Sequence, residues 1–131
     1  MKMSIPDQND ILLACKEVRK NFEENQSIRS KRFPTGWCGD ASVELKKVLK
    51  RKFGIDADLC SGDLYPSHEI TRYNHMWLEY ENYIIDITAD QFNHLNFNNP
   101  AVMVTSDRTF HEKFQYGRKV NGNRIDSGNS E

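Results

Sequence analysis

The spacing of the hydrophobic residues changes at Gly54. Before this glycine, apolar residues recur every three or four positions among charged ones, a spacing typical of amphipathic helices. In residues 7–25 they are Leu12, Cys15, Val18 and Phe22. A second helix is predicted for residues 38–53, with Gly54 placed to end it, and its apolar side carries Ala41, Leu45, Val48, Leu49 and Phe53. Pro34 and Gly36 break the chain between the two helices.

After Gly54 the period becomes two, which predicts β-strands. The strand segments are rich in aromatic and β-branched residues, are separated by Gly, Pro, Asn and Asp, and span 55–61, 74–81, 83–88 and 101–106. Helices followed by strands indicate an α+β fold, with the N-terminal helices packed on an antiparallel sheet. Residues 110–120 fit either a last strand or a short helix. The Asn, Gly and Ser content of 121–131 predicts a disordered tail, so 1–120 would form a single domain.

Size and charge narrow the classes of function. A chain of 131 residues buries about two-thirds of its unfolded surface, enough for a core without disulfides or a structural metal. The net charge of -1 argues against nucleic-acid binding, and no apolar run approaches the roughly 20 residues that cross a membrane. Three cysteines without a CxxC spacing indicate a reducing compartment. We therefore expect a cytoplasmic protein, or one exported without a cleaved signal peptide, and no cofactor.

Cys38 is the candidate nucleophile. It lies at the predicted start of the second helix, between Gly36 and Gly39. Free backbone N–H groups and the helix dipole stabilise an anion there, so the thiol can ionise, and its own N–H can donate to an oxyanion. The alternative is that Cys38 is a small buried hydrophobic residue, the role we assign to Cys15 and Cys60.

His75 and Asp86 are expected to supply a base and its partner. Residues 74–80 and 83–88 flank Glu81-Asn82, a pair short enough to close a β-hairpin. With Tyr80 opposite Tyr83, one face would carry His75, Trp77, Asp86 and Thr88, with His75 diagonally across from Asp86. Asp86 is costly in an apolar strand unless it is paired. The alternative is a solvated strand face without function. Trp77 is the candidate substrate-binding residue.

In chain order, three short motifs resemble those of the transglutaminase-like branch of the papain-like cysteine enzymes. They are Gly36-Trp37-Cys38, then His75-Met76-Trp77-Leu78-Glu79, then Asp86-Ile87-Thr88. The resemblance covers roughly residues 33–92. Departures are Gly39 and Ile87, where many relatives have Trp and Pro. The likeness implies a papain-like core of compact bacterial type with a Cys38-His75-Asp86 triad.

The chemistry that the resemblance implies is acyl transfer through a thioester. The expected function is a cysteine-dependent amide hydrolase or acyltransferase, either a protease or a protein-glutamine deamidase, acting on a peptide or protein. Hydrolysis is favoured because no acceptor site is evident. A true transglutaminase and a non-catalytic protein-binding domain of the same fold stay open. The candidates for a second oxyanion donor are Gln26, Trp37 and Gln91.

Two further patterns receive a structural interpretation. His68, His75, His94 and His111 could cluster around a metal, but their spacings match no metal motif, so no metal site is expected. The basic face from Lys46 to Lys52 is typical of a solvated helix surface. The alternative for this face is docking of an acidic protein partner.

Overall fold

The computed structural model describes residues 7–25, 33–67, 70–121 and 124–126. Its first helix, α1 (Gln8–Glu24), begins at a reciprocal cap: the Asp7 carboxylate accepts from the Asp10 N–H, and the Asp10 carboxylate accepts from the Asp7 N–H. The second described helix, α3 (Cys38–Phe53), follows a turn and has the predicted bounds. It ends at Gly54, whose φ of 70° is the left-handed conformation that glycine adopts without strain.

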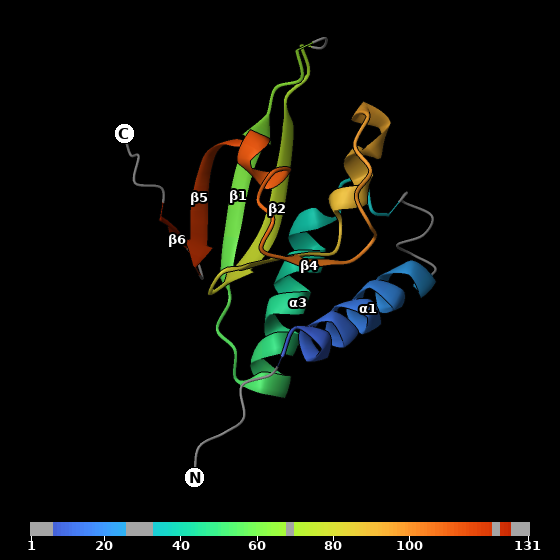
Figure 1. The fold of residues 1–131 in the computed structure, drawn as a ribbon, viewed down its shortest axis with the longest axis vertical. Helices are drawn as coiled ribbons and strands as arrows, with labels where there is room; N and C mark the ends of the chain where they lie inside the picture. The colour runs from blue at the N-terminus through green and yellow to red at the C-terminus, as the bar shows by residue number, and fades with distance from the viewer. Residues whose placement is uncertain (1–6, 26–32, 68–69, 122–123, 127–131) are drawn as a thin grey trace.

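The strands form one sheet in the order β4-β3-β2-β1-β5-β6, with every pairing antiparallel. The expected α+β fold is therefore confirmed at this level, and Figure 1 shows both helices lying against the sheet. The strands are β1 (Asp58–Leu64), β2 (Tyr73–Tyr80), β3 (Tyr83–Asp86), β4 (Met103–Thr105), β5 (Gln115–Asn121) and β6 (Arg124–Asp126).

Several boundaries differ from those predicted, and both β3, which ends at Asp86 rather than at residue 88, and β4, which spans Met103–Thr105 rather than 101–106, are shorter. β1 begins at Asp58 rather than at residue 55, because Ile55 and Ala57 are buried in the segment that leads into the strand. Residues 110–120 contain both expected structures, a 3-10 turn η2 (His111–Lys113) and most of β5. In the segment 121–131, where a disordered tail is predicted, Asn121 ends β5 and 124–126 form β6 through backbone pairing. Residues 122–123 and 127–131 lie outside the described residues.

The sheet is covered on both faces. One core cluster joins the apolar sides of α1 and α3 to sheet residues such as Leu78 and Ile85. A second cluster lies around Trp77 and is built from aromatic residues of the 3-10 helix η1 (Ala89–Leu95) and of the segment around η2. The aromatic members of that second cluster are Trp77, Phe92, Phe110 and Phe114. The N-terminal part of β2, which precedes Trp77, therefore lies in an apolar, aromatic environment.

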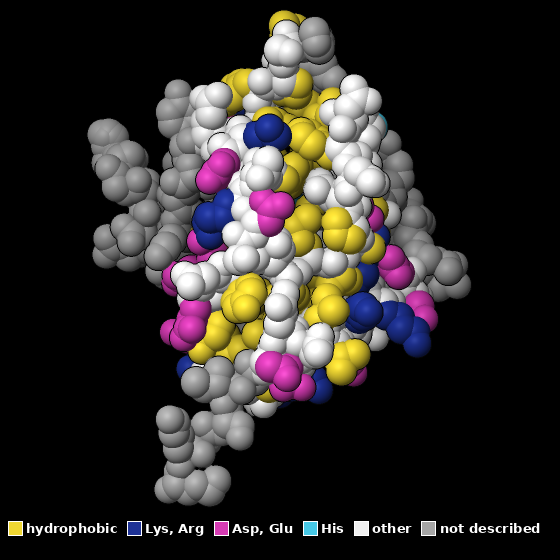
Figure 2. Space-filling view, viewed as in Figure 1, with side chains coloured by type: hydrophobic (Ala, Val, Ile, Leu, Met, Phe, Trp, Pro, Cys, Tyr) yellow, Lys and Arg dark blue, Asp and Glu magenta, His cyan; other side chains and the backbone are white. Residues whose placement is uncertain are grey.

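The outer surface carries charges of both signs. Figure 2 shows Lys and Arg side chains interspersed with Asp and Glu around a band of hydrophobic side chains on the face in view. On α3, Lys46 is tied to the Asp56 carboxylate and the Ala57 carbonyl oxygen, while Lys47 and Lys50 are exposed. Among the described residues, no helix is both long enough and apolar enough to span a membrane.

Candidate active site

A two-residue turn aligns β2 with β3. Glu81 adopts a φ of 55°, and the strands pair with Tyr80 opposite Tyr83 and Leu78 opposite Ile85. This is the predicted register, and it is the one that places His75 diagonally across from Asp86. A shift by one residue would have turned one of the two side chains to the other face of the sheet.

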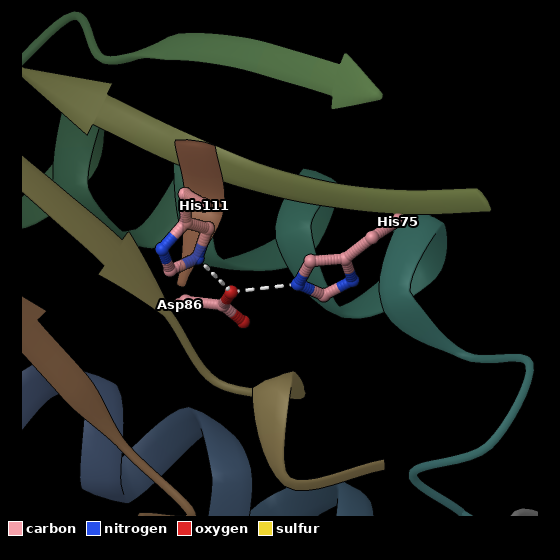
Figure 3. A group of neighbouring side chains, drawn as sticks. All are labelled: His75, Asp86 and His111. Atoms are coloured by element: carbon pink, nitrogen blue, oxygen red, sulfur yellow. Dashed lines mark hydrogen bonds and ion pairs between the residues drawn. The ribbon is translucent and has the colours of Figure 1, made fainter. Parts of the chain in front are cut away.

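Asp86 is the centre of the cluster in Figure 3, where His75 and His111 approach it from two sides. His75 Nε2 lies 2.6 Å and His111 Nε2 lies 2.7 Å from the same oxygen, Asp86 Oδ2. The second oxygen, Oδ1, accepts from the Thr88 backbone N–H at 2.9 Å. The carboxylate is thus held at both oxygens by three donors, which satisfies the partner that a buried charge requires.

The cluster is enclosed by protein. His75 is 0% and Asp86 is 1% exposed, so the alternative of a solvated strand face is wrong. The His75 ring contacts Phe92, Trp77 and Phe114 with ring centroids 5.0, 5.5 and 5.5 Å away. In such a low-dielectric environment the interaction between a carboxylate and an imidazolium is much stronger than in water.

The electrostatics favour an ion pair between His75 and Asp86. Burial by itself lowers the pKa of His75, but the charge and hydrogen bond of Asp86, with smaller contributions from Cys38, raise that pKa to about 9. Burial likewise opposes ionisation of Asp86. The charge of His75 and the hydrogen bonds from His111 and His75 nevertheless hold the Asp86 pKa well below its usual range.

Cys38 occupies the first position of α3. A turn over residues 33–36 leads into the helix, with Gly36 at a φ of 82° and the Trp37 N–H donating to the Pro34 carbonyl oxygen at 3.0 Å. The first N–H groups of a helix have no partner inside it, so the Cys38 sulfur lies at its positive end. Cys38 is 9% exposed.

The start of α3 packs on β2 next to His75. The Ser42 hydroxyl donates to the Met76 carbonyl oxygen at 3.2 Å, and a Cβ on Gly39 would lie 3.3 Å from Met76 Sδ. This packing brings the Cys38 thiol close enough to the His75 ring to raise its pKa. Nε2 of His75 is held by Asp86, which leaves Nδ1 as the nitrogen that can exchange a proton with the thiol.

The thiol and the imidazole are not joined by a hydrogen bond in the described contacts. His75 Nδ1 is buried and has no hydrogen bond of normal geometry among the described residues. Hydrogen bonds at active sites are often long in the absence of substrate and tighten when it binds. The structure thus brings together the three predicted residues, with a firm bond between His75 and Asp86 and a weaker interaction between His75 and Cys38.

The other two cysteines lie in the core, as expected. Cys15 packs in α1 and is fully buried, and burial together with the nearby Asp86 charge raises the pKa of its thiol to about 12. Cys60 is buried in β1, within the aromatic cluster. Neither cysteine is at the start of a helix, and so neither has the environment of Cys38.

The described contacts do not place any of the three candidate oxyanion donors beside Cys38. Gln91 donates its amide N–H to the Thr88 carbonyl oxygen at 2.9 Å, within its own turn. The Trp37 indole packs edge-on against Phe22 of α1, with ring centroids 6.4 Å apart. Gln26 lies outside the described residues. The backbone N–H of Cys38 is thus the donor that the position of the helix supplies.

Trp77 lies beneath the site and does not face a substrate. It is 4% exposed, and its indole N–H donates to Glu79 Oε2 at 3.0 Å. The predicted alternation was right, because Trp77 and His75 lie on the same face of the sheet. At Trp77 that face is covered by Phe114 and His111. The expectation that it binds substrate is corrected by this burial, since a packed core side chain presents no surface to a ligand.

His111 was considered from the sequence only as a possible metal ligand, and its place beside Asp86 was not predicted. It lies in a single 3-10 turn, where no hydrophobic period identifies the buried side. Two signals pointed toward such a partner. A buried carboxylate offers more acceptor positions than His75 alone can fill, and His111 is flanked by Phe110 and Phe114.

The ligand atoms of His75, Asp86 and His111 lie within 4.8 Å of one another, so these residues could in principle hold a metal ion. Two of the four histidines considered for a metal cluster therefore do meet. However, the oxygen-to-nitrogen separations of 2.6 and 2.7 Å are hydrogen-bond distances. Ligands of a tetrahedral zinc ion, each about 2.0 Å from the metal, lie roughly 3.3 Å apart. Both rings would have to move outward to admit an ion.

The remaining histidines lie apart from this cluster. His94 is exposed and makes a 3.1 Å hydrogen bond to the Gln91 carbonyl oxygen, and its ring packs near Tyr73. His68 lies outside the described residues.

Comparison of the chain with models of protein families, with curated proteins and with solved structures finds no match in any of the three. The class of site is therefore defined by its own geometry: a thiol at a helix start, an imidazole beside it, and a buried carboxylate that holds the imidazole.

Proposed function

We propose that the protein is a cysteine-dependent amide hydrolase or acyltransferase, with a Cys38-His75-Asp86 triad in a compact, papain-like core. The observation that carries the proposal is the 2.6 Å bond between His75 Nε2 and Asp86, which leaves His75 Nδ1 for the thiol at the start of α3. The sequence resemblance to transglutaminase-like enzymes supports the same assignment, because its three motifs contain these three residues.

In the first half of the reaction, the Cys38 sulfur attacks an amide carbonyl carbon and a sulfur-carbon bond forms. The Cys38 backbone N–H donates to the resulting oxyanion. His75 holds the thiol proton on Nδ1 and transfers it to the leaving nitrogen as the carbon-nitrogen bond breaks. The products are a thioester and an amine.

In the second half, His75 accepts a proton from water through Nδ1 while the water oxygen attacks the thioester. The sulfur-carbon bond breaks, the proton on His75 is shared again with the departing Cys38 sulfur, and a carboxylic acid is released, which regenerates Cys38. Asp86 stays ionised throughout, because its role is to orient the ring and stabilise the imidazolium. The substrate is a peptide or a protein, and the amide is either a backbone bond or a Gln side chain.

The test is alkylation of the native chain with iodoacetamide near neutral pH, followed by peptide mass spectrometry. We expect Cys38 to react much faster than Cys15 or Cys60, and faster than Cys38 in a His75→Gln variant. Equal rates in the native chain and the variant would overturn the enzyme proposal and favour a non-catalytic binding domain.

The reaction type is then read from peptides that contain Gln, incubated with the native chain and with a Cys38→Ala variant. Backbone cleavage identifies a protease, a gain of about one dalton on Gln identifies a deamidase, and a cross-linked amine identifies a transglutaminase. We expect hydrolysis with the native chain and none with the Cys38→Ala variant. Products that form equally with Cys38→Ala would contradict a thioester on this sulfur.

A further inference from the structure

We propose that His111 is a positioning residue of this site: by donating to the Asp86 oxygen that also holds His75, it fixes the direction in which His75 presents Nδ1 to Cys38. The inference rests on the proposed function and adds to it a fourth residue, on a separate segment of the chain. His111 does not touch the thiol or a reacting atom in the described contacts, so its effect passes through Asp86.

The first reason is the geometry of the carboxylate. Both rings donate to Asp86 Oδ2, at 2.6 and 2.7 Å, while the Thr88 N–H donates to Oδ1. Rotation of the carboxylate about its own axis would break these bonds together. Without the His111 bond, one oxygen would be held only by His75, the ring that has to act on the thiol. His111 therefore gives Asp86 an anchor that is independent of His75.

The second reason is the unpaired nitrogen of His111. Its Nδ1 is buried and has no hydrogen-bond partner among the described residues. The hydrogen bond from Nε2 to Asp86 is thus the one that the described contacts give to the His111 ring, and it directs the ring to the site carboxylate.

The third reason is packing. The His111 ring lies 5.0 Å from Trp77 and 4.9 Å from Phe110, centroid to centroid, and it is 4% exposed. Its orientation is set by aromatic neighbours that do not take part in proton transfer. Because the aromatic cluster around Trp77 fixes the orientation of His111, the hydrogen bond from His111 holds Asp86 in one orientation.

The charged and titratable groups around His75 come from four elements. Asp86 faces it from β3, Cys38 from α3 and His111 from η2, while Cys15 of α1 is close enough to Asp86 to interact with its charge. Because His75 Nδ1 exchanges a proton with the Cys38 thiol in the proposed mechanism, misalignment of the ring changes how the reactivity of the thiol depends on pH. That dependence is a property that a purely structural residue would not alter.

The experiment compares His111→Phe with His111→Gln. Phenylalanine keeps the aromatic packing and removes the donor, and the glutamine amide places an N–H near the position of Nε2. His94→Gln, at the exposed histidine, is the matched control. The readout is the rate of Cys38 alkylation by iodoacetamide as a function of pH, with urea unfolding to confirm that each variant is folded.

We expect His111→Phe to slow alkylation near neutral pH by about tenfold, the size typical of losing an outer partner of a functional histidine. We also expect the pH profile of alkylation in His111→Phe to differ from that of the native chain. His111→Gln should restore most of both the rate and the profile, and His94→Gln should match the native chain. A folded His111→Phe whose rate and pH profile are unchanged overturns the proposal, even if its stability is reduced.

This outcome is distinguishable from failure of the proposed function. If Cys38 of the native chain reacts no faster than a free thiol, the triad itself is refuted. If the native chain is reactive and His111→Phe has the same rate and pH profile, only the role of His111 is refuted.

Discussion

The guanidinium of Arg19 donates to the backbone carbonyl oxygen of Ile87 at 2.8 Å, and so ties α1 to the residue that directly follows Asp86. The same side chain binds both carboxylate oxygens of Asp90, at 2.8 and 2.9 Å, and lies over the Phe33 ring. Arg19 is buried, although it is charged. One side chain of the first helix therefore orders the segment that follows the site carboxylate.

We expect Arg19→Met to lower the free energy of unfolding by about 3 kcal/mol, because it leaves the Ile87 carbonyl and the Asp90 carboxylate without their partner. Arg19→Lys should recover only part of this loss, because a lysine ammonium group cannot make the two parallel hydrogen bonds that the planar guanidinium makes to Asp90. Urea unfolding measures both. Lys20→Met is the control, because Lys20 and its 3.9 Å partner Glu24 are exposed. Equal losses for Arg19→Met and Lys20→Met would contradict this role.

Asp86→Asn should slow the alkylation of Cys38, and it should reduce any hydrolysis that depends on Cys38 by roughly 10⁴-fold. An amide has one oxygen acceptor and no charge, so it cannot accept from the two imidazole N–H groups and the Thr88 N–H together, and it cannot stabilise an imidazolium. Peptide mass spectrometry of the alkylated chain gives the rate. Asp107→Asn is the control because Asp107 is exposed and bonds to Thr109. If Asp86→Asn were folded and as reactive as the native chain, the carboxylate would have no role in activating the thiol.

The pH dependence of stability follows from the two shifted pKa values. The pKa of His75 is raised from 6.5 to about 9. Its contribution to the free energy of unfolding is therefore fully present below pH 6.5 and is lost as the pH rises through about 9. The pKa of Asp86 is lowered, so its contribution is present above the usual Asp value and is lost as the pH falls below it. We therefore expect the free energy of unfolding to fall on both sides, at alkaline pH (the alkaline limb) and at acid pH (the acid limb).

The alkaline limb is measured as the difference in unfolding free energy between the native chain and His75→Gln. This difference should be larger near about pH 6 than near about pH 10, because only the charged ring is stabilised by Asp86. Subtracting the variant removes the titration of lysines and tyrosines, which the two chains share. A difference that stays constant across this range would show that His75 is not charged in the folded protein.

Gly62→Ala should destabilise the protein by about 2 kcal/mol through overpacking. A Cβ at Gly62 would lie 2.8 Å from Phe114 Cβ and 3.4 Å from Trp77 Cη2, and the first of these atoms cannot move without its backbone. Gly39→Ala is the matched control, since its Cβ would meet only the flexible Met76 thioether, at 3.3 Å. Thermal unfolding compares the two. A Gly39→Ala variant that loses as much stability as Gly62→Ala would contradict this reasoning.

The parts of the fold that the sequence predicts well are those with a clear period and a clear end. The helix from Cys38 to Phe53 has both, with apolar residues on one side and Gly54 after it, and its bounds are correct. β1 was placed three residues early because Ile55 and Ala57 are apolar and buried without being in the strand. Hydrophobicity indicates burial, but it does not distinguish a strand from a packed connection.

For the site, a short hairpin turn made the relation between His75 and Asp86 predictable. Once Tyr80 lies opposite Tyr83, alternation determines the rest. The place of His111 was not predictable in this way, because it depends on how a distant 3-10 turn folds over the aromatic cluster. The burial of Trp77 was missed for the same reason: alternation gives the face of the sheet, but not what covers it.

Cys38 and His75 belong to two separately built parts of the molecule, a helix and a hairpin, and among the described residues these parts meet where α3 packs on β2. Sliding the helix along the sheet would alter the gap between sulfur and nitrogen while leaving the tethered imidazole untouched. Because a misplacement of about 1 Å can cost roughly 10²-fold in rate, the activity proposed for Cys38 would depend on how firmly α3 is seated on β2.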